Sequence, residues 1–298
     1  MIPRSVEVMD NQAEVREFLR TRRARVTPDQ AGLLTGGRRR VTGLRREEVA
    51  MLASVSTDYY AKMERGNLTG VSPEILDAVA TALQLDEAET AHLRDLARAA
   101  TPALARRRPR ATDGTVRPSL QRFLDAVTGA PAWVVNQRKD LLATNALGRA
   151  LMAPMLDDPS NGANLARFTF FSPLSRSLYP DWKQGANSIA ASLRSTAGQH
   201  PHDKALTDLI GELVTRSDDF RLRWSAHNVR FHRSGTKRIH HPDVGDLEFT
   251  FEGLELPDHP GCTLYAYTTV AGSPTEERIQ LLGNLAATRE AAAADLDR

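Results

Sequence analysis

The clearest alternation of apolar and polar positions lies between residues 43 and 66, in the segment GLRREEVAMLASVSTDYYAKMERG. Its first half predicts a short helix and a tight turn, because apolar or small residues recur at helical spacing: Val49, Ala50, Leu52, Ala53 and Val55. Ser56 is a typical N-cap residue, so we expect a second helix from Thr57 to Glu64 that ends before Gly66. Two short helices joined in this way predict a helix-turn-helix.

Further segments of helical period flank this pair. We expect a first helix over 11–23, with Val15, Phe18 and Leu19 on one face, and a loop or broken helix over 27–42. Later helices are expected to begin at Ser72-Pro73 and at Asp86. Residues 1–100 therefore predict a compact all-α domain. The proline-rich and basic stretch 101–118 predicts a solvated linker, with phosphate contact by its arginines as the alternative.

The rest of the chain mixes two periods. Helical spacing predicts helices that begin near Ser119 and Pro274, and others over 145–152, 181–197, 206–214 and 219–227. Alternating or β-branched runs predict strands over 132–136, 140–143, 247–252 and 263–270. Antiparallel strands with helices on one face are the natural solution for this order of elements, so residues 119–290 predict an α+β domain.

Charge is unevenly distributed along the chain. The net charge is +2, but residues 16–46 hold ten arginines against two acidic residues, a local charge of +8. A basic patch beside a helix-turn-helix is typical of phosphate contact, whereas an ordinary solvated face usually mixes both signs. Residues 1–112 carry a net charge of +4 and the remainder −2, so the basic surface belongs to the N-terminal part.

Composition narrows the class of protein further. Apolar residues make up 41% and charged residues 26% of the 298 residues, an ordinary globular balance. The single cysteine, Cys262, allows no disulfide within the chain, and we expect it to pack in the core. No stretch has the length of a signal-peptide core or of a membrane span. We expect a soluble, cytoplasmic protein without membrane contact.

The second helix of the pair supplies the candidate DNA-binding residues, because this helix enters the major groove with its N-terminal residues against the bases. These are Ser56, Thr57, Asp58, Lys62 and Arg65, with Arg38, Arg39, Arg40 and Arg45 as further phosphate contacts. Asp58 is suited to accept from a cytosine amino group, although an acid at this position also favours the helix dipole. An ordinary αα-hairpin has the same apolar period, and the basic flank favours the DNA-binding interpretation.

Several segments in the same order resemble the MmyB-like family of transcription regulators. They include GGRRRVTGLRREEVAMLASVSTDYYAKMERG near the N-terminus, and WVVNQRKDLLATNALGRAL, NLARFTFFSP, LYPDW, GELVTRSDDFRLRW and KRIHHPDVGDLEF later in the chain. The resemblance covers residues 13–285. It implies an Xre-type, lambda-repressor-like helix-turn-helix joined to a PAS-like sensor domain, a homodimer that binds double-stranded DNA, and a fatty-acid-like ligand.

The resemblance also implies roles for single residues. Ser54 stands where such motifs usually have glycine in a left-handed turn, and Glu64 matches an acid that pairs with an arginine of the first helix, here Arg22 or Arg23. A carboxylate ligand requires a cation and apolar walls. The candidates are Arg167, Asn164, His227, Trp133 and Phe168, with Phe171, Trp182, Trp224 and Phe231 as further possible walls; these aromatic residues would equally well fill a core.

Motifs for catalysis are missing from the sequence. It contains no glycine-rich phosphate loop, no Gly-x-Ser-x-Gly and no His-Glu-x-x-His, so we expect no enzyme, catalytic residue or cofactor. Its histidines follow no standard ligand spacing, and we expect no metal.

Three hypotheses follow. The first is a DNA-binding regulator modulated by a small apolar acid. The second is an enzyme in the C-terminal domain tethered to an autoregulatory helix-turn-helix. The third is a helix-turn-helix that binds protein only.

Overall fold

The computed structural model describes residues 11–33, 39, 41–100, 115–201, 203–229 and 233–296. The chain forms two compact units, one of residues 1–108 with 190–231, the other of residues 109–189 with 232–298. The division falls within helix α12 (Trp182–Gln199), so residues 190–231 belong to the same unit as the N-terminal helices. Most of the expected linker lies outside the described residues.

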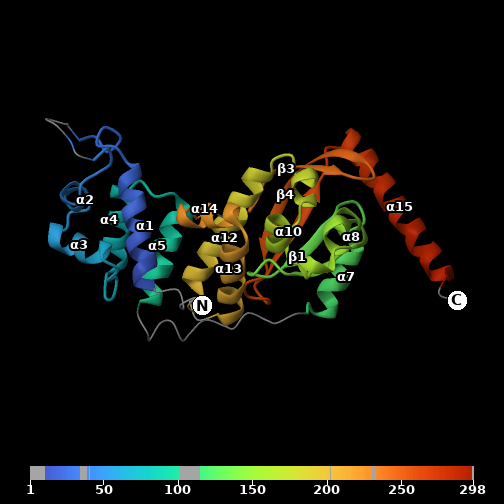
Figure 1. Ribbon diagram of the computed structural model, residues 1–298, viewed down its shortest axis with the longest axis horizontal. Coiled ribbons are helices and arrows are strands. Elements are labelled where there is room, and N and C mark those ends of the chain that lie inside the picture. Colours follow the sequence, from blue (N-terminus) through green and yellow to red (C-terminus); the bar gives the residue numbers. More distant parts are fainter. Residues whose placement is uncertain are drawn as a thin grey trace. The chain divides into compact units, whose positions relative to one another are not determined.

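The first unit is helical, as the sequence predicted (Figure 1). Its core gathers Val15, Phe18 and Leu19 of the first helix, which are fully buried, and the later segment contributes Val229. Besides the end of α12, its helices are α1 (Asn11–Arg25), α2 (Arg46–Leu52), α3 (Thr57–Glu64), α4 (Pro73–Ala82), α5 (Glu87–Ala99), α13 (Lys204–Arg216) and α14 (Asp218–Ser225).

The turn between α2 and α3 has the geometry that its residues predicted. Ser54 adopts a left-handed backbone conformation with φ 56°, in place of the usual glycine. The Val55 amide donates to the Ala50 carbonyl at 2.9 Å. Ser56 caps α3, because its hydroxyl accepts from the Tyr59 amide at 3.1 Å. Ala50 is buried where the two helices meet. The predicted helix-turn-helix is confirmed.

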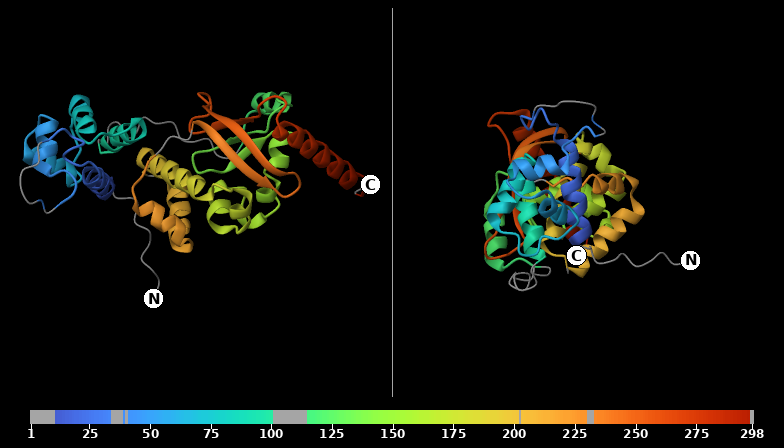
Figure 2. Two further views of the ribbon diagram at one scale, coloured as in Figure 1. Left: turned by 90° about the horizontal axis from the view of Figure 1, so that it is seen from above. Right: turned by 90° about the vertical axis from the view of Figure 1, so that its left-hand side faces the viewer.

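The second unit is built on a five-stranded antiparallel sheet, shown from two sides in Figure 2. The strand order is β2-β1-β5-β4-β3, which confirms the predicted α+β organisation. The strands are β1 (Ala132–Val135), β2 (Leu141–Thr144), β3 (Ser234–His241), β4 (Gly245–Glu255) and β5 (Thr263–Thr268).

Each face of the sheet has its own apolar cluster. One holds the aromatic side chains Trp133, Phe249, Phe251, Tyr265 and Tyr267, together with residues from the helices that cover this face. The other holds smaller residues and the buried Cys262. The helices of this unit are α7 (Pro118–Ala126), α8 (Ala146–Leu151), α9 (Ala153–Leu156), α10 (Leu165–Phe171), α11 (Leu174–Leu178), the start of α12 and α15 (Pro274–Leu296), with a 3-10 turn η1 (Pro159–Asn161).

Strand β3 was not predicted, because its sequence SGTKRIHH is mostly polar and charged. It lies at the edge of the sheet and exposes Arg238 and His240, while Ile239 and His241 are buried. Helix α15, drawn red in Figure 1, runs well past the sheet of its own unit. No helix in the described ranges has the length and apolar character needed to span a membrane.

Candidate DNA-binding and ligand-binding sites

One side of α3 and its C-cap residue carries exposed polar side chains that are unpaired among the described residues. Thr57, Asp58, Lys62 and Arg65 are exposed and make no hydrogen bond or ion pair with any described residue, whereas Tyr60 and Met63 are buried beneath them. Helix packing therefore fixes α3 from below and leaves its polar residues available. Charged side chains held on a rigid helix without protein partners are suited to contact DNA.

The neighbouring arginines behave differently, because the fold brings acidic residues to them from later in the chain. Arg23 donates two hydrogen bonds of 2.8 Å to Glu64, and Arg46 contacts the same carboxylate at 3.1 Å. Arg25 and Arg22 pair with Glu89. The predicted pairing of Glu64 with an arginine of the first helix is confirmed, and Arg23 is that arginine.

The expected unbroken basic patch is therefore corrected. Arg39 pairs with Glu48 at 2.7 Å and 2.8 Å, and its guanidinium lowers the pKa of Glu48 to about 2. Arg45 is exposed, and its guanidinium pairs with Glu47 at 3.3 Å. The candidates Arg38 and Arg40 lie outside the described residues. Much of the positive charge counted along the sequence is thus neutralised within the fold.

Asn164, a ligand candidate, has a structural role instead. Its side-chain oxygen accepts from the amides of Ala166 and Arg167 at the start of α10, at 2.9 Å and 3.0 Å. Its amide nitrogen donates to the Arg138 carbonyl and to Asp140 at 2.8 Å and 2.7 Å. These four bonds use the full capacity of an asparagine side chain, so Asn164 is not available to a ligand.

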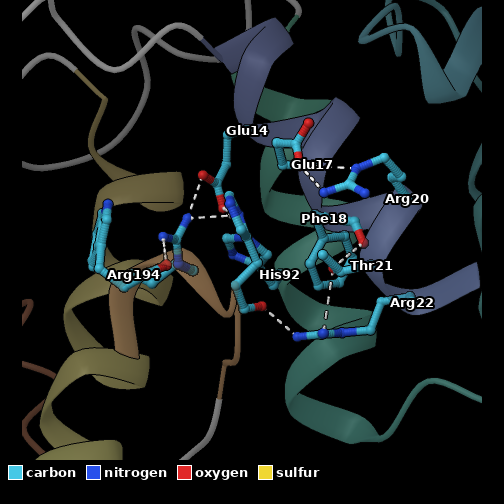
Figure 3. A network of polar contacts seen from close by, with 10 residues as sticks. Glu14, Glu17, Phe18, Arg20, Thr21, Arg22, His92 and Arg194 are labelled. Carbon is cyan, nitrogen blue, oxygen red and sulfur yellow. Dashed lines mark hydrogen bonds and ion pairs between the residues drawn. The ribbon is translucent and has the colours of Figure 1, made fainter. Parts of the chain in front are cut away.

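His227 belongs to the first unit, whereas Trp133, Asn164 and Phe168 belong to the second. It lies 3.0 Å from Arg194 and 3.5 Å from Glu14, in a buried polar network shown in Figure 3. Arg194 is 1% exposed and binds the Glu14 carboxylate, donates to the Trp224 carbonyl and stacks on the Trp224 ring at 3.9 Å. We therefore remove His227 and Trp224 from the ligand candidates.

The same network lowers the pKa of Glu14. Burial raises the pKa of this carboxyl, but the contacts with His227, His92 and Arg194 outweigh burial and lower its pKa well below the ordinary value. His92 lies 3.5 Å from Glu14, in edge contact with Phe18. Glu14 is thus held ionised in the interior, where an ionised group requires such partners.

Trp133 and Phe168 are brought together in the aromatic cluster of the second unit. Phe168 is fully buried and meets Tyr179 edge to face at 6.2 Å. Trp133 lies 4.5 Å from Tyr267, and its indole Nε1 is buried without a hydrogen-bond partner. Arg167 stands half-buried at the start of α10, Trp182 donates to Thr169, and Phe231 lies outside the described residues.

Lys237 on β3 is a residue that sequence reasoning missed. It pairs in register with Phe249, and its ammonium lies 4.3 Å from the centre of the Tyr179 ring. Burial lowers the pKa of Lys237 to about 8, with Asp181 acting in the opposite direction. The alternation of Lys237 with Ile239 and His241 was the available signal, and it is readable only once β3 is known to be a strand.

No group of three or more histidine, cysteine or acidic side chains is placed to hold a metal ion within the described part of the chain.

A helix-turn-helix with a free polar face, combined with a separate α+β unit, defines a class of DNA-binding protein with a ligand-binding domain. Residues 116–282, more than half of the chain, match the ligand-binding domain of MmyB-like transcription regulators, and residues 14–93 match a helix-turn-helix domain. The chain belongs to the MmyB-like transcription regulators. No curated protein gives a match to it.

Proposed function

We propose that this protein is a cytoplasmic, homodimeric regulator that reads a specific operator through α3 and responds to a fatty-acid-like ligand in a PAS-like second unit. The observation that carries the DNA-binding part is the contrast on the first unit. The four exposed side chains Thr57, Asp58, Lys62 and Arg65 have no partner among the described residues. The neighbouring arginines, by contrast, are bound by Glu64, Glu89 and Glu48.

The proposal divides the α3 residues by role. Thr57 and Asp58 stand at the N-terminal end of the helix, which lies closest to the bases when such a helix enters the major groove. Lys62 and Arg65, farther along, contact phosphates, and Ser56 adds a phosphate contact beside its role as cap. Arg45 is more exposed than Arg39 and is the better placed of these two for a phosphate, whereas Arg39 contributes only if it leaves Glu48.

The five-stranded sheet and its aromatic inner face support the sensor part of the proposal. In the proposed dimer, ligand binding shifts the population of arrangements of the two helix-turn-helix domains and drives no reaction. The enzyme alternative has no specific observation in its favour among the described residues.

Selection of binding sites from a random DNA library, followed by titration at several salt concentrations, tests the DNA-binding part. Lys62→Ala is expected to weaken binding to all sequences and to reduce the log–log salt slope by about 0.9, the effect of one lost phosphate contact. Thr57→Ala is expected to change the preferred base at one position, by about 1–3 kcal/mol of discrimination.

Lys204→Ala is the matched control for Lys62→Ala, because Lys204 is an exposed lysine on α13 of the same unit. It should leave affinity and salt slope unchanged. If both α3 variants bind DNA like the unchanged protein, α3 is not the reading helix. Sedimentation of the protein on a selected operator tests the homodimer.

A further inference from the structure

The face of the sheet that carries the aromatic cluster, which we call the inner face, gathers hydrogen-bond donors without an acceptor among the described residues. Trp133 Nε1 is buried and unpaired. The hydroxyls of Tyr179 and Tyr267 make no hydrogen bond with any described residue, although both side chains are at least nine-tenths buried. Buried polar groups in native proteins are nearly always paired, so the buried Trp133 Nε1 calls for an acceptor from outside the described residues, and the two phenol hydroxyls are available to bind the same acceptor.

These donors form a continuous series with Lys237. The Lys237 ammonium lies 4.3 Å from the Tyr179 ring centre, and the Tyr179 phenol is close enough to Tyr267 to contribute to the raised pKa of Tyr267. Tyr267 in turn packs against Trp133 at 4.5 Å. The series therefore runs along the inner face of the sheet, from the edge strand β3 to β1.

Lys237 also lacks the partner that a partly buried cation normally has. No carboxylate lies within ion-pair distance of its ammonium in the part of the chain that the structure describes. The nearest acid that acts on it, Asp181, is already bound by Arg238 at 2.5 Å and 2.8 Å. Gly185 of α12 leaves room for the ammonium, since a Cβ there would lie 3.2 Å from Lys237 Nζ.

We propose that Lys237, with the hydroxyls of Tyr179 and Tyr267 and the indole of Trp133, binds the anionic head of a small amphiphilic carboxylic acid. An ammonium and an indole donate and never accept, so the head must be an acceptor, and an anion neutralises the lysine. The surrounding Phe249, Phe251 and other side chains of the aromatic cluster suit an apolar body. This proposal rests on the sensor function proposed above and names its anchoring residue.

Lys139 shows that a shifted pKa alone does not mark the site. Burial lowers the pKa of Lys139 to about 8 as well. It lies in the turn between β1 and β2, and no aromatic ring stands against its ammonium in the described structure. The geometry around Lys237 separates the two lysines.

An inward lysine on an edge strand has a second possible use, because charges of this kind discourage strands of two molecules from pairing. The two uses predict different behaviour of Lys237→Met. If Lys237 prevents edge-strand pairing, its loss gives association of the protein without loss of ligand affinity. If Lys237 anchors the ligand, its loss gives weaker ligand binding by a protein in an unchanged oligomeric state.

Calorimetric titration of the full chain with dodecanoate and with dodecanol, both below their aggregation limits, tests the anchor. Lys237→Met is expected to weaken dodecanoate binding about 10- to 100-fold, the loss of one charge-assisted hydrogen bond, and to leave dodecanol binding unchanged. Tyr267→Phe and Trp133→Phe are each expected to weaken dodecanoate binding about two- to tenfold. Lys183→Met removes an exposed lysine from α12, the helix whose Gly185 lies beside Lys237, and serves as control.

A second measurement does not depend on the variants. In protein labelled at lysine Cε, the resonance of Lys237 is expected to titrate near its lowered pKa of about 8. Bound dodecanoate should raise that pKa by about one unit or more, since tenfold coupling equals one unit. Tyr179 and Tyr267 have pKa values raised above their ordinary value by burial, so neither titrates in this range.

The outcomes separate this proposal from the function on which it rests. Equal dodecanoate affinity of Lys237→Met and the unchanged protein overturns the anchor and leaves a ligand sensor in place. Dodecanol binding as tightly as dodecanoate, or no dodecanoate binding by the unchanged protein, overturns the carboxylate head. Failure of α3 variants to alter DNA binding overturns the assignment of α3 as the reading helix and does not affect the titration.

Discussion

Arg194 in the first unit is a buried cation and Lys237 in the second unit is a partly buried one, and the two differ in their partners. Arg194 binds Glu14, donates to the Trp224 carbonyl and stacks on the Trp224 ring. Lys237 has an aromatic ring against it and no carboxylate within ion-pair distance among the described residues. A buried cation whose partners all belong to the fold stabilises the structure, whereas a cation without a carboxylate partner is available to bind an anionic ligand.

This difference also separates the two regions in what they connect. The partners of Arg194 come from α1, from α14 and from the segment that follows α14, so its network joins the helix-turn-helix region to helices of the family's ligand-binding domain within one unit. The partners of Lys237 all belong to the sheet and helices of the second unit. The Arg194 network therefore connects two parts of one unit, and we call it the joint, whereas the surroundings of Lys237 form a candidate ligand-binding site.

The largest expected effect is on the joint. Arg194→Met leaves Glu14 buried without its strongest cation, which costs about 3–5 kcal/mol of unfolding free energy. Lys237→Met removes a charge that has no counterion and should change the free energy of unfolding by less than about 1 kcal/mol. Urea unfolding followed by tryptophan fluorescence measures both. In the first unit Trp224 is the reporter.

The double variant Glu14→Leu with Arg194→Met is the control. Replacing both charges with apolar groups should recover most of the lost stability, because no unpaired charge remains. Equal losses for Arg194→Met and Lys237→Met would contradict the distinction between the two cations.

The second prediction compares two glycines of the same helix. A Cβ at Gly198 would lie 2.7 Å from the His92 ring, and a Cβ at Gly185 would lie 3.2 Å from the flexible end of Lys237. Gly198→Ala should therefore cost about 1–3 kcal/mol through overpacking. Gly185→Ala should be neutral or slightly stabilising, because the lysine can move and alanine favours a helix. Thermal unfolding of both variants distinguishes them, and a stable Gly198→Ala protein would show that α12 and α5 do not pack so closely.

The sequence predicted features that depend on near neighbours. The α2–α3 pair, the Ser56 cap and the left-handed Ser54 follow from residues a few positions apart. The arginine partners do not, because Glu64 lies 41 residues from Arg23 and Glu89 lies 64 residues from Arg25. Counting charge along 16–46 therefore overestimated the basic surface.

The candidate ligand site was harder to predict for the same reason. Lys237 faces inward only because β3 pairs with β4 in the register that sets Lys237 opposite Phe249. Asn164 had the right chemistry for a ligand contact, but the turn that it caps uses all its hydrogen bonds. Neither the register of β3 on β4 nor the full use of the Asn164 hydrogen bonds can be deduced from the order of residues in the sequence.

The third prediction concerns acid. The folded-state pKa of Glu14 is below its ordinary value of 4.5, so its contribution to stability is present above pH 4.5 and is lost as the pH falls below it. The difference in unfolding free energy between the unchanged protein and Glu14→Gln should shrink from pH 5 to pH 3, by at most about 1.4 kcal/mol per pH unit. Urea unfolding at each pH measures it. A difference that stays constant would mean that Glu14 is not ionised in the folded protein.

The smallest effect is expected at alkaline pH and belongs to Lys237. Its folded pKa of about 8 is below the ordinary 10.5, so the unfolded chain binds more protons between these values and stability rises with pH across that range. The gain is well below the limiting 1.4 kcal/mol per pH unit, because the side chain is partly exposed. Unfolding free energies of the unchanged protein and of Lys237→Met, compared from pH 8 to 10, isolate it from other groups. Bound dodecanoate should reduce this gain, since the anion favours the charged ammonium and so raises the folded pKa of Lys237 toward its ordinary value. A gain that is unchanged with saturating dodecanoate would place the acid elsewhere.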